Sequence, residues 1–238
     1  FTIDWDQVRA KINDKTRLLI VNSPHNPCGS IFTGDDLETL ADIVESNDLF
    51  VISDEVYEHM VFDDAKHLSI LCSERLRQRS FVISSFGKTY HATGWKIAYC
   101  IAPPAYTKEF RKIHQYVTFT THTPSQWAIA DFMEECPEHH LELSDFYQQK
   151  RDYFLSAMSA SRFAMTPSQG SYFQLADYSN ISQEDDVTFA NYLTQEIGVA
   201  AIPISVFYQS PPDQHIVRFC FAKDDQTLTA AAEKLVKI

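Results

Sequence analysis

The chain is organised around one stretch, Arg79-Ser-Phe-Val-Ile-Ser-Ser-Phe-Gly-Lys-Thr-Tyr-His-Ala-Thr-Gly-Trp-Lys96. Its short apolar and β-branched run at 81–83 predicts a buried strand. Lys88 follows that strand, beside Gly87, which would let the backbone turn sharply. An ammonium group at such a place must stay hydrated or find a partner, because burial of an unpaired charge is costly.

Lys88 would be partly desolvated there and close to a second cation, Lys96, one short loop away. Both effects favour the neutral amine, which is a nucleophile toward carbonyl carbons. Hydroxyl groups flank the lysine at Ser84, Ser85 and Thr89. Together with Lys96 they suit a phosphate group. Most lysines that follow a strand are simply solvated, so this stretch alone leaves a catalytic and a plain loop interpretation open.

Length and composition restrict the class of protein. The 238 residues suffice for one large domain or two modest ones, and 45% hydrophobic and 22% charged content is ordinary for a globular protein. A net charge of -12 argues against nucleic acid or an anionic membrane surface as a partner. We also expect no membrane span, because no apolar run approaches the required length.

The cysteines predict a reducing compartment and no metal site. They are scattered, without a C-x-x-C pair, at Cys28, Cys72, Cys100, Cys136 and Cys220. This pattern fits neither a disulfide framework nor a zinc site, so we expect a cytoplasmic protein. Glycine is scarce at six residues, and no phosphate loop of the G-x-G-x-x-G or Walker type occurs.

The first half of the chain alternates strands and helices. Continuous apolar runs at 17–21 and 49–52 predict strands buried on both faces, with a helix over 33–46 between them. The run at 97–102 predicts a strand that could be antiparallel, because its connection to the preceding strand is short. Further helices are expected over 4–12, 104–117, 123–133 and 137–159.

Three of these expected strands end in polar side chains. Asn22 and Asn26 follow the first strand, Asp54 follows the second, and Lys88 follows the third. The carboxyl ends of parallel strands share one rim of a sheet, where α/β proteins bind their ligands. We therefore expect amides, a carboxylate and a lysine at one rim.

The pattern changes near residue 161 to that of a smaller α+β unit. Strands are expected over 171–175, 199–202 and 215–221, and helices over 186–197 and 224–236. We predict a large domain over 1–140 and a small domain over 141–238.

Five segments resemble those of the fold-type-I aminotransferases, which use pyridoxal 5'-phosphate. In the family's order they are Asn22-Ser-Pro-His-Asn-Pro-Cys-Gly29, Ser53-Asp-Glu-Val-Tyr57, Ser84 to Lys96, Gly170-Ser-Tyr-Phe173 and Val217-Arg-Phe219. Each is weak alone, whereas five in register along the whole chain are specific. The chain looks similar to the kynurenine/glutamine-type subgroup, which includes bacterial methionine-preferring enzymes. The resemblance implies an α/β fold: the C-terminal part of a large, mostly parallel-sheet domain, followed by a small α+β domain.

The resemblance also implies roles around the cofactor ring. Lys88 would form a Schiff base with the cofactor aldehyde and later move the proton from the substrate Cα. Asp54 would face the pyridine nitrogen and keep it protonated. Tyr57 and Asn26 would hydrogen-bond the phenolic oxygen of the cofactor.

The remaining implied roles concern two anionic groups. Ser85 and Lys96 would hold the cofactor phosphate, although Lys96 stands where arginine is commoner and offers a point charge instead of a fork. Arg218, with Asn22, would bind the substrate α-carboxylate. An arginine in an apolar strand could instead merely pair with an acid. Cys28 stands where relatives usually have threonine.

The implied activity is transfer of an amino group from an apolar, sulfur-containing or aromatic L-amino acid to a 2-oxo acid, by a homodimer. A carbon–sulfur β-lyase on the same scaffold and a non-catalytic regulator domain stay open as alternatives. The family has an N-terminal part before the residue that matches Phe1, with a phosphate-binding turn and an aromatic that stacks on the ring. We therefore expect the isolated chain to be inactive, to bind the cofactor weakly and to leave apolar sheet faces open.

Overall fold

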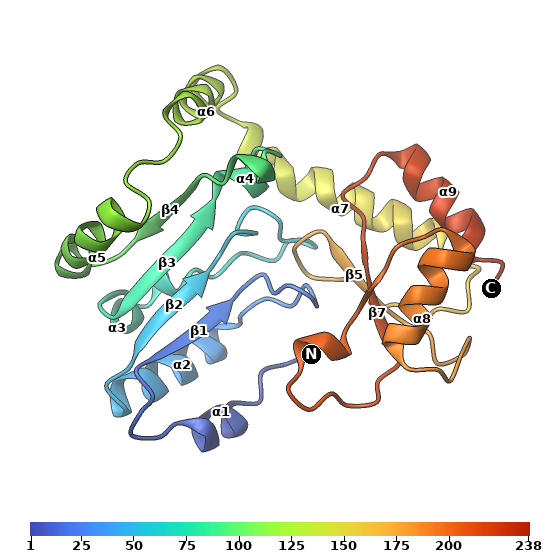
Figure 1. The fold of residues 1–238 in the computed structure, drawn as a ribbon, viewed down its shortest axis with the longest axis horizontal. Helices are drawn as coiled ribbons and strands as arrows, with labels where there is room; N and C mark the ends of the chain where they lie inside the picture. Colours follow the sequence, from blue (N-terminus) through green and yellow to red (C-terminus); the bar gives the residue numbers. More distant parts are fainter.

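The computed structural model describes residues 1–238 and contains two sheets, with a long helix between them in sequence (Figure 1). The first sheet has the order β1 (Leu18–Asn22), β2 (Phe50–Asp54), β3 (Ser80–Ser85) and β4 (Ala98–Ile101). The first three strands are parallel and β4 is antiparallel to β3. This confirms the α/β class and the antiparallel strand that the short connection favoured.

One face of this sheet is covered by α2 (Gly34–Ser46), which begins with the capping box of Thr33 and Asp36. Its buried side chains meet those of the strands in a cluster of ten residues that includes Leu40, Val51 and Val82. The short helix α1 (Trp5–Lys11) is attached to α2 by a hydrogen bond from the Trp5 indole to Asp36, at 2.8 Å. A further turn, α3 (Glu74–Arg77), precedes β3.

The opposite face of the sheet is open. Leu18, Ile20 and Phe50, which the β1–β2 register places on one face, are 43%, 72% and 36% exposed, and we call the surface that they share the open face. The prediction that the run 17–21 is buried on both faces was therefore wrong, because no element of this chain covers its outer side. The helices α5 (Pro104–Val117) and α6 (Thr123–Glu135) bury only Ile129 between them. The expected open apolar faces are thus confirmed.

The second sheet is antiparallel, in the order β5 (Phe173–Asp177), β7 (Ile216–Cys220) and β6 (Ile202–Pro203). It packs with α7 (His139–Ala157), α8 (Asp186–Tyr192), the π-helical turn Leu193–Ile197 and α9 (Asp225–Leu235). The strand predicted over 199–202 is wrong except at Ile202. The Val199 N–H instead bonds the Leu193 carbonyl at 2.9 Å, as part of the helix end at Gly198.

These elements enclose a cluster of 21 buried residues, which we call the C-terminal core. It contains Phe154, Phe219 and Leu235, and it also takes Tyr57, Met60 and Phe62 from the loop after β2. The predicted boundary between residues 140 and 141 stays a prediction. None of the helices has the length and apolarity that a membrane crossing requires.

Three backbone segments meet between the two sheets, and we call residues 29, 60–62 and 169–171 the seam. Phe62 N bonds Gln169 O at 2.9 Å, Ser171 N bonds Met60 O at 2.9 Å, and Gln169 N bonds Gly29 O at 3.1 Å. Gly29 has φ +70°, and a Cβ there would lie 2.7 Å from Gly170 O. A Cβ on Gly170 would lie 2.8 Å from Met60 O. The close approach at the seam therefore requires both glycines.

Candidate active site

Lys88 lies on α4 (Phe86–Thr89), a single helical turn that begins where β3 ends. Ser85 caps the turn by accepting a hydrogen bond from Gly87 N at 3.2 Å. Gly87 does not supply the sharp turn that we expected, because its φ is not positive. A Cβ at Gly87 would lie only 3.0 Å from the Thr93 Cα, so close packing of the 92–95 loop is what favours glycine there.

The Lys88 amine is partly buried among aromatic rings. Its Nζ donates a hydrogen bond to the Tyr172 hydroxyl at 3.1 Å and lies 5.5 Å and 5.7 Å from the ring centroids of Tyr57 and Tyr172. No carboxylate forms an ion pair with it, although a partly buried cation ordinarily has one. The solvated-loop interpretation is therefore wrong for Lys88.

Tyr57 is buried in the loop after β2, beside the lysine. Its ring meets those of Tyr172 and Phe173 edge-on, with centroids 5.1 Å and 6.0 Å away. Burial, with the neighbouring Tyr172, raises the pKa of Tyr57 well above its usual range. The phenol therefore keeps its proton at neutral pH and is available as a hydrogen-bond donor.

Asp54 and Asn22 lie opposite each other at the ends of two adjacent strands. The β1–β2 register pairs them, and the β2–β3 register pairs Asp54 with Ile83, so the predicted common rim is present. Asp54 Oδ1 accepts from Val56 N at 3.2 Å. The Asn22 amide donates to Asp54 O and accepts from Asn26 N, both at 2.8 Å, so Asn22 shapes its own loop and has one amide hydrogen left for a ligand.

Arg218 on β7 reaches across to the loop after β1 and donates to Asn26 Oδ1 at 2.5 Å. Its guanidinium carbon lies 3.9 Å from the centroid of the Phe173 ring, and its Nε is buried without a partner. Burial lowers the pKa of Arg218 from its ordinary value. No acid pairs with it, so the alternative in which Arg218 merely completes an ion pair is wrong.

The two residues expected at the phosphate differ in how free they are. Lys96 is exposed, has φ 56°, and makes no hydrogen bond or ion pair through its side chain. Ser85 Oγ is engaged in the cap and has only a long contact, 3.4 Å, to Ile97 O. Ser84 faces elsewhere, because its hydroxyl and that of Tyr99 both donate to Glu58.

The charge pattern of this region fits an anionic ligand. In a chain of net charge -12, Lys88, Lys96 and Arg218 all lack a carboxylate partner. A phosphate and a carboxylate, the two anions that the family resemblance implied, are the groups that such cations bind. The residues present therefore fit a phosphorylated cofactor together with a carboxylate substrate.

Sequence reasoning missed two residues of this site, Tyr172 and Phe173. The motif Gly170–Phe173 indicates the family but predicts no role for either ring, although Tyr172 contacts Lys88 and Phe173 contacts Arg218. The available signal was the glycine before them, since Gly170 holds the seam and so fixes where the two rings point.

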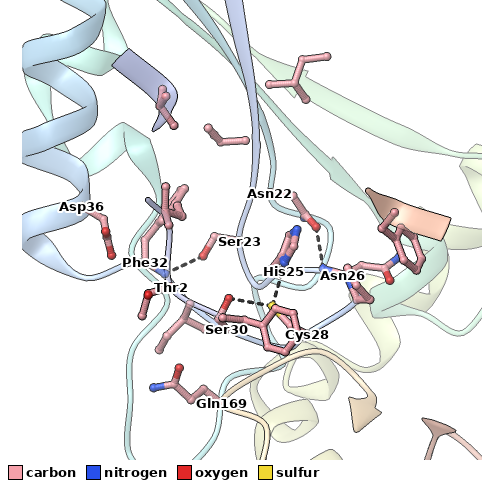
Figure 2. A pocket seen from close by; sticks show the side chains of 18 of the residues that line it. Thr2, Asn22, Ser23, His25, Asn26, Cys28, Ser30, Phe32, Asp36 and Gln169 are labelled. Atoms are coloured by element: carbon pink, nitrogen blue, oxygen red, sulfur yellow. Dashed lines mark hydrogen bonds between the residues drawn. The ribbon is translucent and has the colours of Figure 1, made fainter. Parts of the chain in front are cut away.

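A cavity of about 850 Å³ lies beside the 22–30 loop (Figure 2). Asn22 and Asn26 line it, but Lys88, Asp54 and Arg218 do not, so it is separate from the lysine side of the site. The Cys28 thiol lies there, 2.9 Å from His25 Nδ1 and 3.1 Å from Ser30 Oγ. Burial alone would raise the pKa of Cys28, but these hydrogen bonds outweigh it and the pKa is lowered.

Residues 1–235 match the family described as aminotransferase class I and II. The chain belongs to this family. It is 49% identical over 235 residues to an Escherichia coli methionine aminotransferase, a match that covers 99% of this chain and 61% of that protein. It is 36% identical to a kynurenine–oxoglutarate transaminase of Dictyostelium discoideum, over 99% of this chain and 60% of the other.

Solved structures of other family members agree with the fold. That of an Escherichia coli methionine aminotransferase superposes with a TM-score of 0.95 at 48% identity, covering 100% of this chain and 63% of its own. An N-succinyldiaminopimelate aminotransferase from Mycobacterium tuberculosis gives 0.93 at 35% identity, with 100% and 62% covered. The chain thus spans about three fifths of the length of the family members it matches.

Proposed function

We propose that the protein is a pyridoxal-phosphate-dependent aminotransferase that moves an amino group from an L-amino acid to a 2-oxo acid. The observation that carries the proposal is the pair of partly buried cations, Lys88 and Arg218, that hold a hydroxyl and an amide instead of carboxylates. A preference for apolar or sulfur-containing donors such as methionine is supported by the 49% identical Escherichia coli relative.

The residues that would hold the cofactor are Lys88, Asp54, Tyr57, Asn26, Ser85 and Lys96. When bound, pyridoxal phosphate supplies an electron sink for negative charge that develops at the substrate Cα. The Asp54 carboxylate, at the end of β2, would hold a proton on the ring nitrogen. Tyr57 would donate to the ring oxygen, since its raised pKa keeps the phenol protonated. Lys96 and the Ser85 hydroxyl would bind the phosphate.

The substrate would be oriented by Arg218. A planar guanidinium stacked on Phe173 keeps its donors in a fixed fork, which matches a carboxylate. The Lys88 amine would act as the nucleophile and would then take the proton from the substrate Cα. Asn26 accepts from Arg218 and therefore links substrate and cofactor contacts.

The finer statements are also part of this proposal. We propose a cytoplasmic homodimer whose substrates are amino and 2-oxo acids. A carbon–sulfur β-lyase would use the same lysine, aspartate and arginine, and no observation in the structure favours it. Release of pyruvate and a thiol, without amino transfer to an added 2-oxo acid, would identify it.

Borohydride trapping tests the proposal. The chain is incubated with pyridoxal phosphate and reduced, and the modified lysines are located by peptide mass spectrometry. Because trapping accumulates product, it detects even weak binding. We expect the adduct to concentrate on Lys88 and to disappear from that peptide in Lys88→Arg, whereas Lys66→Arg, an exposed control, leaves it unchanged. Adducts spread over exposed lysines, with none on Lys88, would overturn the proposal.

A further inference from the structure

We propose that the Tyr172 hydroxyl is a positioning group that holds the Lys88 amine inside the active site. The inference rests on the proposed function, because it assigns a partner to the lysine that would react. It starts from one contact, the 3.1 Å hydrogen bond from Lys88 Nζ to Tyr172 Oη. This is the only hydrogen bond that the lysine side chain makes.

The Tyr172 ring is held on several sides. Edge-on contacts join it to Tyr57 at 5.1 Å and to Phe173 at 4.8 Å, and Tyr147 lies 5.8 Å away. The backbone is fixed as well, because Tyr172 O accepts from Phe221 N at 3.1 Å. The hydroxyl oxygen is therefore held at one position, where the Lys88 amine binds it.

Packing alone would not need this hydroxyl. A phenylalanine ring at position 172 would make the same edge-on contacts with Tyr57 and Phe173, since Phe173 itself meets the Tyr57 ring edge-on without a hydroxyl. The hydroxyl instead adds an acceptor among aromatic rings, where Lys88 has no carboxylate to bind. A phenol oxygen has two lone pairs, so it can accept from Lys88 while its own O–H stays free to donate.

The consequence is a fixed resting place for a long, flexible side chain. Lysine carries four rotatable bonds, and a free amine would spend most of its time in solvent. Bound to Tyr172 Oη, the amine stays beyond the edge of that ring and 5.5 Å from the centroid of the Tyr57 ring. Geometric placement of this kind is a large part of how an intramolecular amine gains reactivity toward a bound partner.

Limited acetylation with acetic anhydride tests this, because it needs no cofactor. The purified chain is acetylated briefly at neutral pH, and the acetylated fraction of each lysine is read by peptide mass spectrometry. In Tyr172→Phe the amine loses its acceptor, so we expect Lys88 to be acetylated about tenfold faster, the factor that one hydrogen bond to a charged group supplies. Lys96, eight residues on, reports local unfolding and should keep its rate.

Tyr147→Phe is the matched control. It removes a hydroxyl from the same aromatic group, one that contacts His91 Nδ1 at 3.2 Å and not the lysine. Its Lys88 rate should equal that of the unchanged protein. Equal Lys88 rates in Tyr172→Phe and the unchanged protein would overturn the proposal, as would a parallel rise at Lys96. If borohydride traps the cofactor on Lys88 but Tyr172→Phe leaves the acetylation rate of Lys88 unchanged, the positioning role alone is wrong. If Tyr172→Phe raises that rate but no cofactor is trapped on Lys88, the proposed function alone is wrong.

Discussion

The C-terminal core and the open face of the first sheet are built from similar sequence but differ in what covers them. Phe219, at the centre of the C-terminal core, packs against Phe154 and Phe163 with ring centroids 5.9 Å and 5.7 Å away. Ile20 on β1 is as apolar and lies in a run at least as continuous, yet it is 72% exposed. An apolar run thus predicts a strand, whereas burial depends on a second layer that the run itself does not specify.

The two regions also differ in what holds them. The C-terminal core has 21 buried apolar residues, and the cluster beneath the first sheet has ten. The first sheet is additionally held by a buried carboxylate, Glu55, which accepts from Ser53 Oγ at 2.8 Å and Ile70 N at 3.1 Å and lies 2.9 Å from His67 Nε2. We therefore expect the stability of the C-terminal core to fall most when a buried side chain is truncated, and that of the first sheet when the Glu55 charge is removed.

The largest effect is expected at Phe219. Phe219→Ala should lower the free energy of unfolding by about 3–5 kcal/mol, because it opens a cavity among rings that cannot collapse into it. Ile20→Ala should change it by less than about 0.5 kcal/mol, since the side chain is already in solvent. Denaturant unfolding followed by circular dichroism measures both. Similar losses for the two variants would remove the distinction between the regions.

Glu55→Gln should cost less, about 1–3 kcal/mol at neutral pH. Burial alone would raise the pKa of Glu55, but hydrogen bonds from His67, Ser69 and Ser53 outweigh it, so the pKa lies below its ordinary value. The charge therefore stabilises the fold above about pH 4.5, and this contribution is lost as pH falls through the folded-state pKa. The difference in the free energy of unfolding between Glu55→Gln and the unchanged chain should therefore shrink at acid pH. A difference that is constant from pH 7 to pH 3 would contradict this.

The 22–30 loop lies between the two regions, and a smaller effect is expected at its thiol. Because the His25 and Ser30 contacts lower the pKa of Cys28, iodoacetamide should alkylate it faster at neutral pH than Cys100, whose pKa burial raises. His25→Ala should slow alkylation of Cys28 about threefold to tenfold and leave Cys100 unchanged. Mass spectrometry of the alkylated peptides gives both rates. Cys100 reacting first would show that the contacts do not activate Cys28.

The smallest change in stability is expected on the open face. Ile20→Lys should alter the free energy of unfolding by less than about 0.5 kcal/mol, but it should reduce self-association through the apolar surface. Sedimentation velocity over a range of chain concentrations measures this. Ser46→Lys, at the exposed last residue of α2, is a control for added charge alone. If both variants associate like the unchanged chain, the open face is not adhesive.

Much of the fold could be predicted, because local patterns and the family resemblance agree. The strands before Asn22, Asp54 and Lys88 were each marked by an apolar run that ends in a polar residue, and parallel order then brought them to one rim. The open face could not be predicted from the run 17–21, which looks the same whether or not a layer covers it. At Val199 the competing demand was the helix end, which uses the N–H that a strand would need.

The sequence predicted which residues gather at the site better than it predicted which side chains they contact. Spacing and resemblance indicated Lys88 and Arg218, but not that Tyr172 and Asn26 would be their partners. Those pairs join residues 84 and 192 positions apart, so no local pattern carries them. For Asn22 the sequence predicted a contact with the ligand, whereas its amide mainly bonds backbone groups that only the folded loop brings near.

The seam has a mechanical consequence. Gly29 and Gly170 leave no room for a side chain, and the hydrogen bonds to residues 60–62 lock the three segments together. Any swing of the second sheet relative to the first must then turn about this point as a pivot. Side chains near the pivot, such as Arg218 and Tyr172, would travel little, while α9 at the far side would travel most. The hydrogen bonds from Arg218 to Asn26 and from Lys88 to Tyr172, which lie near this pivot, would therefore be strained least by such a swing.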